Sequence, residues 1–306
     1  MIIISGENVA DLLPAGPGLL RAVLGGGPAN TAVAAARLGA AVSFAGRFGS
    51  DGFGQEFRAR LSAAGVDLTH AADLAAPSAL ARVNLDAAGV ASYDFWLHGA
   101  ADFAATELPA AGPHDIQHIG SLAAYWPPGA DVAERWIDHA PGTATFDVNL
   151  RPIVLESQPD AIGRLERLVS RADLVRTSDE DLRLAYPAVD PEDTARRWLK
   201  EGAEGGGTPS LVVMTQGADG AIGLTQDGLR VHVPAPKVDV VDTVGAGDAA
   251  MGALLYKLAS TDLATVRANL AETLRFTVSV AALACTKAGA YAPTAQEAEA
   301  FFSTMR

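Results

Sequence analysis

Short apolar runs rich in β-branched residues alternate along the chain with longer segments rich in alanine, leucine and arginine. The short runs predict strands buried on both faces, at residues 2–4, 42–45, 116–119, 143–148, 174–175 and 211–214. The longer segments predict helices, at residues 29–38, 55–64, 132–139, 161–171, 191–200, 248–259 and 262–284. This alternation predicts an α/β fold, with a doubly wound, mainly parallel sheet and helices on both faces. Sheets of this type bind ligands beyond the carboxyl ends of their strands.

A strand-like pair of segments interrupts the alternation. Residues 78–86 and 89–97 flank Ala87-Ala88-Gly89 and predict a hairpin. Tyr93, Phe95 and Trp96 are too many aromatic side chains for a hairpin surrounded by water. We therefore expect a small β lid at about residues 77–100, with Phe95 and Trp96 facing inward. This lid is inserted in a single domain that spans residues 1–306.

The second half of the chain contains three further features. Residues 201–210 include consecutive glycines and predict a surface loop. Residues 221–224 and 229–233, around Asp227-Gly228, predict a second hairpin. A strand-like run at residues 238–241 then leads into the segment with the most distinctive chemistry.

The charge balance narrows the class of protein. The 306 residues include 23 Lys and Arg but 36 Asp and Glu, so the net charge is −13. Such a chain is poorly suited to nucleic acid or to an anionic membrane surface. No apolar run reaches the roughly 20 residues of a membrane-spanning helix, and the first residues lack the basic start of a secretory signal. We expect a cytoplasmic protein with small-molecule partners. The single cysteine, Cys285, excludes an intrachain disulfide and a multi-cysteine metal site.

The segment Asp242-Thr243-Val244-Gly245-Ala246-Gly247-Asp248 stands at the start of a predicted helix. Small residues there leave consecutive N–H groups exposed, and the positive end of the helix dipole adds to their attraction for an anion. Asp248 has two interpretations. It caps the helix, as aspartate often does, or it is a general base that takes a proton from a hydroxyl beside a bound phosphoryl group. The spacing alone leaves both open.

A second glycine-rich turn, Gly25-Gly26-Gly27-Pro28-Ala29-Asn30, opens the first predicted helix. Glycine lets a ligand approach the backbone closely, and Asn30 offers a donor and an acceptor to hydroxyl groups. An ordinary helix entry is the alternative. The chain lacks a GxxxxGK[ST] motif, which excludes a Walker-type phosphate loop, and Asn30 breaks the GxGxxG pattern. A nicotinamide-dependent oxidoreductase would leave Asp242–Asp248 unexplained.

Together these segments resemble the paired signatures of the ribokinase (PfkB) family of carbohydrate kinases. The N-terminal signature covers Gly25–Asn30 and continues to residues 46–54, and the C-terminal signature is Asp242–Asp248. With the intervening segments, the resemblance covers nearly the whole chain, and the second motif is highly specific. It implies a ribokinase-like fold and an enzyme that transfers the γ-phosphoryl group of ATP to a primary hydroxyl of a sugar. ATP, Mg²⁺ and K⁺ are the implied cofactors.

The resemblance also implies roles for individual residues. Asp248 would deprotonate the sugar hydroxyl, beside an anion hole made by the amides of Gly245, Ala246, Gly247 and Asp248. The sugar would be held by Asp11, Gly26, Gly27 and Asn30. The nucleotide would lie against Thr215, Gly217 and Gly220. A monovalent cation would lie beside Asp242 and the carbonyl groups near Ala284, Lys287 and Gly289.

Two arginines are further candidates for substrate binding. Arg151 lies in Asp147–Pro152, which resembles the DxNxRP segment of fructokinases and 2-keto-3-deoxygluconate kinases. Its guanidinium is suited to clamping a phosphate or a sugar carboxylate bidentately, and a surface salt bridge is the alternative. Arg82 and Phe95, in the predicted lid, are expected to face the substrate, although a role for Arg82 elsewhere is equally open.

One departure from the family concerns Mg²⁺. The family's N-x-x-E motif aligns with Ser178-Asp179-Glu180-Asp181, so Ser replaces Asn and Asp replaces the longer Glu. A contact from Asp181 to Mg²⁺ through water would absorb the shorter side chain. Glu180 is the alternative ligand.

Asp147–Pro152 favours fructose or a keto-sugar acid over ribose or a nucleoside, and of these we expect fructose and a fructokinase-like sugar kinase. A 2-keto-3-deoxygluconate kinase or another PfkB sugar kinase is the alternative, and a non-catalytic sugar- or nucleotide-binding protein is the alternative from a different class. The aromatic side chains of the lid favour a homodimer formed through it. A monomer with a closing lid fits the same pattern.

Overall fold

The large sheet confirms the predicted α/β architecture. The structure, a computed structural model, describes residues 1–85, 91–205 and 207–304. Eight strands follow the order β14-β13-β12-β11-β10-β9-β1-β4. Six of them are parallel: β1 (Ile2–Ile4), β4 (Val42–Phe44), β9 (Ile116–Gly120), β10 (Thr143–Asp147), β11 (Leu174–Ser178) and β12 (Leu211–Thr215). The predicted second hairpin forms the antiparallel edge, with β13 (Ala221–Thr225) and β14 (Arg230–Val233).

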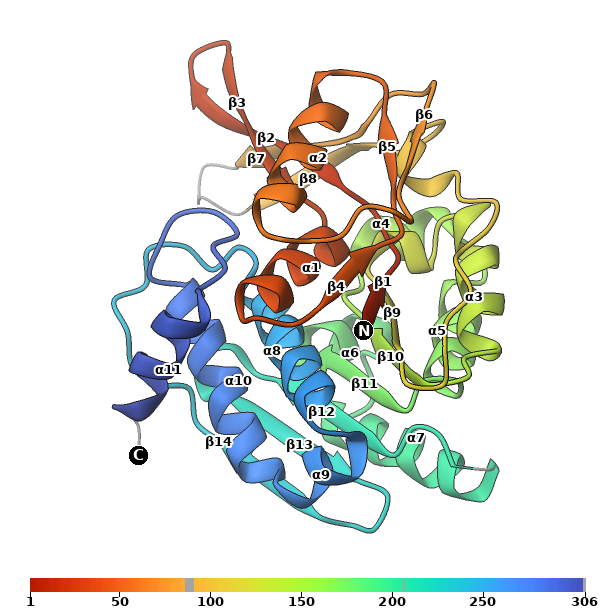
Figure 1. Ribbon diagram of the computed structural model, residues 1–306, viewed down its shortest axis with the longest axis vertical. Coiled ribbons are helices and arrows are strands. Elements are labelled where there is room, and N and C mark those ends of the chain that lie inside the picture. The colour runs from red at the N-terminus through yellow and green to blue at the C-terminus, as the bar shows by residue number, and fades with distance from the viewer. Residues whose placement is uncertain (86–90, 206, 305–306) are drawn as a thin grey trace.

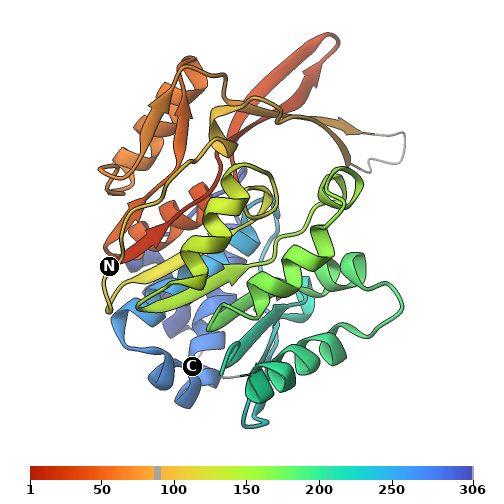
Figure 2. The same ribbon diagram turned by 90° about the vertical axis from the view of Figure 1, so that its right-hand side faces the viewer.

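Helices cover both faces of this sheet because its strands are apolar on both faces (Figures 1 and 2). One face packs against α1 (Gly27–Arg37), α8 (Ala246–Ser260) and α10 (Leu270–Ala284), and α2 (Gly52–Ala63) contributes to the same core. The other face packs against α3 (Gly129–Asp138), α5 (Ala161–Val169) and α7 (Pro191–Gly205). Neighbours along one strand divide between the two cores: Leu174 packs into the first and Val175 into the second.

A smaller sheet stands beside the large one, at the top of the view in Figure 2. Its order is β3-β2-β7-β8, with β2 (Val9–Gly16), β3 (Leu19–Gly25), β7 (Ala79–Leu85) and β8 (Ala91–Trp96). The predicted hairpin is therefore present, and its turn at Ala87-Ala88-Gly89 lies outside the described residues. The sheet also takes two strands from residues 9–25, which the predicted insertion at 77–100 did not include. Pro14, Gly16, Pro17 and Gly18 obscure their alternation.

Several predicted elements differ from the observed ones. The helix predicted at 262–284 is two helices, α9 (Leu263–Ala268) and α10, separated at Asn269. Residues 201–205, predicted as loop, continue α7. Residues 238–241 are irregular rather than a strand, since Pro234 and Pro236 lack the N–H groups that would extend the ladder of β14.

Further short elements were not predicted from the sequence. They are α4 (Pro152–Ser157), α6 (Asp179–Ala185), α11 (Ala295–Ser303), a two-stranded sheet of β5 (Arg47–Gly49) and β6 (Ala72–Leu74), and three 3₁₀ turns, η1 (Ala101–Phe103), η2 (Leu122–Ala124) and η3 (Gly217–Asp219). Among the described residues, every helix is too short or too polar to cross a lipid bilayer.

Candidate active site

The carboxyl ends of the parallel strands bring together residues that are distant along the chain. Asn149 and Arg151 follow β10, Thr215 ends β12, and Asp248 lies in the first turn of α8. Because parallel strands all end at the same edge of a sheet, these segments meet there, as α/β folds require for a ligand site.

The Asp248 carboxylate is buried and held by two amide side chains. Asn30 Nδ2 donates to Asp248 Oδ2 at 2.8 Å, and Asn149 Nδ2 donates to Asp248 Oδ1 at 3.3 Å. The residue that caps α8 is Gly245, in the left-handed conformation with φ 77°, and no side chain caps this helix end. The Asp248 side chain therefore serves the site between α1, β10 and α8, rather than capping its own helix.

The charge of Asp248 is set by opposing influences. Burial raises the pKa of the Asp248 carboxyl above its ordinary value. The hydrogen bond from Asn30 lowers this pKa, and so do the positive charges of Arg151, Arg176 and Arg60. These groups stabilise the ionised form of a carboxyl whose pKa burial raises.

Arg176 lies directly beneath the first turn of α8. A Cβ atom at Gly247 would stand only 2.9 Å from Arg176 Nη2 and 3.0 Å from Nη1, so glycine is needed for this contact. The buried guanidinium donates from Nη1 to Asp147 Oδ1 at 3.0 Å and from Nη2 to Thr215 Oγ1 at 2.5 Å. Its charge therefore adds to the positive end of the α8 dipole.

The amides of this turn are not equivalent. The N–H of Ala246 donates to the carbonyl oxygen of Thr243 at 3.2 Å, so it is already engaged. Gly247 and Asp248 stand in the first turn, where backbone N–H groups have no partner within the helix. An anion at this helix end would meet these two amides first.

The glycine-rich turn lies against the same carboxylate. Gly26 has φ 95°, and a Cβ there would stand 2.7 Å from the carbonyl oxygen of Glu7. A Cβ at Gly27 would stand 2.7 Å from Asn149 Nδ2, the group that contacts Asp248. Glycine at both positions lets the two halves of the site approach each other.

Asp11 joins this group from β2 in the small sheet. Its carboxyl lies beside Gly25. Burial raises the pKa of Asp11 to about 6, the charge of Arg151 lowers it, and the charge of Asp248 raises it. The structure therefore brings Asp11, Gly26, Gly27, Asn30, Arg151 and Asp248 together.

Phe95 and Arg82 lie on opposite faces of the small sheet. Asp11 pairs with Ala81 and Ala81 with Phe95, so Phe95 shares the face of Asp11. Arg82 pairs with Leu12 and Asp94 on the opposite face and is exposed. Arg82 and Phe95, both predicted to face the substrate, therefore do not share a face of the sheet. Trp96 is 52% exposed, and it does not face inward with Phe95 because neighbouring residues on a strand alternate.

Ser178 and Asp181 form a reciprocal capping box at the start of α6. Asp181 N donates to Ser178 Oγ at 3.0 Å, and Ser178 N donates to Asp181 Oδ2 at 2.8 Å. Leu150 N donates to Asp181 Oδ1 at 2.9 Å, which ties the loop after β10 to α6. The two departures from the family motif therefore fit each other, since a short hydroxyl and a short carboxylate form this box. Glu180 is exposed.

The predicted metal residues suit metal ions that arrive bound to a nucleotide. They do not form a site in which protein side chains alone surround the ion. The described residues contain no group of three or more acidic, histidine or cysteine side chains arranged for a metal. Mg²⁺ on nucleotide phosphates keeps several waters and needs few carboxylates, and Asp181 retains lone pairs for such a water. Asp242 Oδ1 accepts from Val244 N at 3.0 Å and Oδ2 from Gly289 N at 2.8 Å, so it joins the two loops predicted to bind K⁺.

The predicted nucleotide segment follows β12. Gly217 opens the η3 turn with φ 54°, and Gly220 closes it with φ 97°. Positive φ at both positions requires glycine, which gives this turn its shape at the sheet edge beside Arg176 and Thr215.

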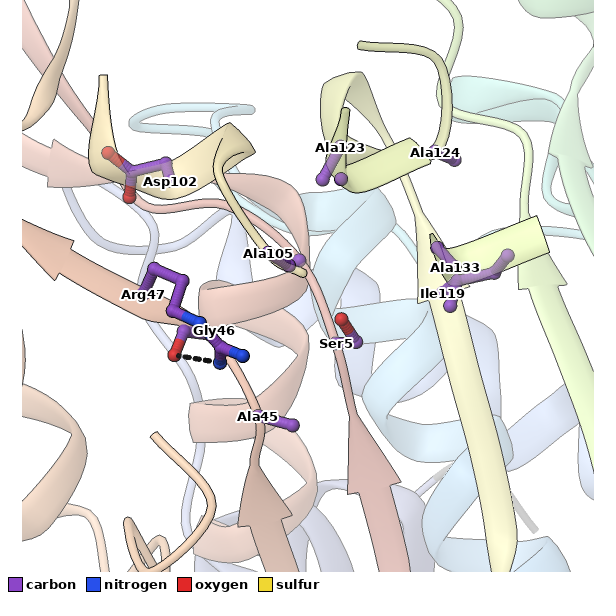
Figure 3. Close-up of a pocket in the computed structure, with 12 residues that line it drawn as sticks. Ser5, Ala45, Gly46, Arg47, Asp102, Ala105, Ile119, Ala123, Ala124 and Ala133 are labelled. Atoms are coloured by element: carbon purple, nitrogen blue, oxygen red, sulfur yellow. Dashed lines mark hydrogen bonds between the residues drawn. The ribbon is translucent and has the colours of Figure 1, made fainter. Parts of the chain in front are cut away.

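A narrow pocket near the ends of β1 and β4 is separate from this group (Figure 3). Ser5, Gly46, Arg47 and Asp102 line it, and the predicted site residues do not. Asp102 accepts from the backbone N–H groups of Asn8 and Ala79, at 3.0 and 2.9 Å. The pocket therefore belongs to the junction between the two sheets.

The sequence analysis did not identify Arg60, Asn149 or Arg176 as site residues, nor Glu7 as a buried carboxyl beside η2. Asn149 lies within Asp147–Pro152, so the motif itself contained the signal. Arg176 lies near the carboxyl end of a buried strand, where a charged residue is unusual. Glu7 is buried, and its Oε2 accepts from Ala123 N at 2.9 Å.

Glu7 is expected to make stability depend on pH. Burial raises its pKa from 4.5 to about 7. Between these values the folded chain binds a proton that the unfolded chain releases, so this contribution to stability is lost as pH rises toward 7. Relative to wild type, Glu7→Gln is expected to gain about 2.5 kcal/mol in unfolding free energy between pH 5 and pH 8.

Urea denaturation at both pH values measures this change. Exposed Glu56→Gln, in α2, is the control and is expected to follow wild type. If the difference in unfolding free energy between Glu7→Gln and wild type is the same at pH 5 and pH 8, the raised pKa of Glu7 is contradicted.

Comparisons with known proteins agree with this geometry. The model of the pfkB family carbohydrate kinases matches residues 19–297. A fructokinase from Rhizobium leguminosarum bv. trifolii is 34% identical over 276 residues, 87% of this chain and 82% of that protein. The structure of fructokinase from Xylella fastidiosa with bound ATP has a TM-score of 0.89 at 30% identity, covering 99% of this chain and 98% of the other. Fructokinase from Vibrio cholerae O395 bound to fructose, ADP and calcium has a TM-score of 0.85 at 29% identity, covering 98% of both chains. The chain therefore belongs to the pfkB family of carbohydrate kinases.

Proposed function

We propose that this chain is a fructokinase, which transfers the γ-phosphoryl group of ATP to a primary hydroxyl of fructose. One observation carries the proposal: the buried Asp248 carboxylate lies at the amino end of α8 and is held there by Asn30 and Asn149. A proton acceptor and a helix end that attracts anions are thereby placed together.

In the proposed reaction, Asp248 takes the proton of the sugar hydroxyl. That oxygen forms a bond to the γ-phosphorus as the bond to the bridging oxygen of ADP breaks. The amides of Gly247 and Asp248, with those of Gly245 and Ala246 as further candidates, stabilise the phosphoryl oxygens, and the charge of Arg176 supports them from below. Alignment and fixed electrostatics then provide most of the rate enhancement.

The remaining site residues bind the two substrates. Asp11, Gly26, Gly27, Asn30 and Arg151 hold the sugar, and Phe95 covers it from the small sheet. Thr215, Gly217 and Gly220 face the nucleotide. Asp181 or Glu180 would reach a nucleotide-bound Mg²⁺ through water, and Asp242 would contribute to a K⁺ site; when bound, Mg²⁺ would neutralise phosphate charge.

The charges around the sugar residues favour a neutral ketose over a sugar acid. Arg151 and Arg60 lie near Asp248, and Arg151 also lies near Asp11. With Arg176 and its partner Asp147 included, three arginines lie among three carboxylates (Asp11, Asp147 and Asp248), so the group as a whole carries no surplus positive charge for a substrate carboxylate. A 2-keto-3-deoxygluconate kinase would benefit from such a surplus.

The small sheet is proposed to act as a lid on a single domain and to form a homodimer contact. Closing over the sugar would exclude water that otherwise hydrolyses ATP. Leu20 and Trp96 are large apolar side chains exposed on the same face of this sheet, opposite Phe95. Burying them against a second copy would remove apolar area from water.

We place the enzyme in the cytoplasm, where ATP is available.

Substrate identity is tested by coupled measurement of ADP release against fructose, other ketoses, 2-keto-3-deoxygluconate and a ribonucleoside. Fructose is expected to give the highest kcat/KM. A higher value for the sugar acid would replace fructose as the assignment. Binding of sugar and ATP without ADP release would instead indicate a non-catalytic binding protein.

Asp248→Asn is expected to lower kcat by about 100-fold or more, the usual contribution of a general base. The amide is nearly isosteric, so calorimetry is expected to show fructose binding that is largely retained. Near-normal kcat in this variant would remove Asp248 from the proposed role.

The homodimer is tested with Trp96→Glu and Leu20→Glu, combined in one chain. The charged pair is expected to convert a dimer to a monomer in sedimentation equilibrium. Arg135→Glu, on the exposed side of α3, is the control. A wild-type chain that sediments as a monomer at high concentration would contradict the proposal.

A further inference from the structure

Arg60 is a partly buried arginine of α2 whose charge lacks a direct carboxylate partner. Its Nη1 donates to the carbonyl oxygen of Leu24 at 3.1 Å, and its Nη2 donates to Asn30 Oδ1 at 2.7 Å. Within the described parts of the chain, no carboxylate lies within ion-pair distance of its guanidinium. Charged groups removed from water usually have such a partner. The charge of Arg60 is instead directed at the Leu24 carbonyl oxygen and the Asn30 amide oxygen.

The contact with Arg60 fixes the orientation of the Asn30 amide. A guanidinium can only donate hydrogen bonds, and an ionised carboxylate can only accept them. The Asn30 oxygen must therefore face Arg60, and its NH₂ group must face Asp248, where it donates to Oδ2 at 2.8 Å. The opposite orientation would place NH₂ against the guanidinium and oxygen against the carboxylate.

We propose that Arg60 is a positioning residue for phosphoryl transfer, which holds the Asn30 amide toward Asp248 and places a positive charge behind it. The proposal rests on the proposed kinase function. Arg60 acts through Asn30 rather than by touching the reacting atoms. Its second bond, to Leu24, anchors it at the end of β3, next to the glycine-rich turn.

The electrostatic surroundings indicate what the loss of Arg60 would do. Burial raises the pKa of Asp248, and Arg60 is one of three arginines that lower it. The charged groups coupled to Asp248 come from five elements or their adjoining loops: Asp11, Arg60, Asp147, Arg151 and Arg176. Removal of one cation from this set is expected to raise the pKa of Asp248, so that a smaller fraction is ionised near neutral pH.

The test compares Arg60→Met, Arg60→Lys and the matched control Arg58→Met. Methionine keeps much of the apolar stem, and lysine keeps the charge without the planar fork that reaches two acceptors. Arg58 lies on the same helix but turns to Asp73 and to the ring of Phe48. Initial rates with fructose and ATP are measured from pH 5.5 to pH 9, and folding of each variant is checked by its thermal transition.

Arg60→Met is expected to lower kcat at neutral pH about tenfold and to shift the acidic limb of the kcat profile upward by roughly one unit. In Arg60→Lys, the acidic limb of the kcat profile is expected to lie at the same pH as in the wild type. The value of kcat is expected to fall several-fold, because lysine holds the Asn30 amide less firmly. Arg58→Met is expected to match the wild type. If Arg60→Met does not fold, Arg60→Lys decides: a wild-type kcat in that variant would overturn the proposal.

Other outcomes would also overturn it. If KM for fructose rises while kcat and the acidic limb of its pH profile stay unchanged, Arg60 would be a substrate-binding residue instead. A loss confined to sugar acids would make it a specificity residue for anionic substrates.

A second readout does not depend on activity. The Asp248 resonance, identified by its absence in Asp248→Asn, is titrated by NMR in protein with ¹³C-labelled aspartate. Its midpoint is expected to rise in Arg60→Met but not in Arg58→Met, and an unchanged midpoint would overturn the proposal. An inactive wild-type chain would refute the kinase function alone, and this titration would still decide the role of Arg60.

Discussion

The proposed role of Asp248 requires its carboxylate to remain ionised in a place where burial favours the protonated form. The hydrogen bonds come from α1 and from the loop after β10, through Asn30 and Asn149. The positive charges come from α2, β11 and the start of α4, through Arg60, Arg176 and Arg151. No single segment could provide this environment, so the site exists only when the sheet and its helices are assembled.

The topology explains why those segments can meet. Parallel strands end at one edge of the sheet, and the helices that follow them begin there, with the positive ends of their dipoles facing the same space. At two positions a side chain would prevent these segments from meeting, and glycine is present at both. Gly247 lets the backbone of α8 rest on Arg176, and Gly27 lets the turn before α1 approach Asn149. These glycines are therefore requirements of packing at the site rather than only sources of flexibility.

The sequence predicted the large sheet well, because strands buried on both faces are continuous apolar runs. It predicted the residues around Asp248 where they belonged to a compact motif, as with Gly26, Asn30 and Arg151. It did not reveal Arg60 or Arg176, since their partners lie far away along the chain. The small sheet was recognised only in part, because prolines and glycines mask the alternation of residues 9–25. The sequence also could not show that Arg82 and Phe95 lie on opposite faces of the small sheet, because the face of each residue depends on register, which a hairpin pattern alone does not define.

The central claim is that one buried carboxylate receives the sugar proton beside a helix end that holds the transferring phosphoryl group. A crystal structure with fructose, ADP, Mg²⁺ and aluminium fluoride, which mimics that phosphoryl group, tests this most directly. The account predicts the fluoride complex against the amides of Gly247 and Asp248, with a primary hydroxyl oxygen of fructose within hydrogen-bond distance of the Asp248 carboxylate. A sugar whose primary hydroxyls all point away from Asp248, or a fluoride complex remote from the start of α8, would contradict it.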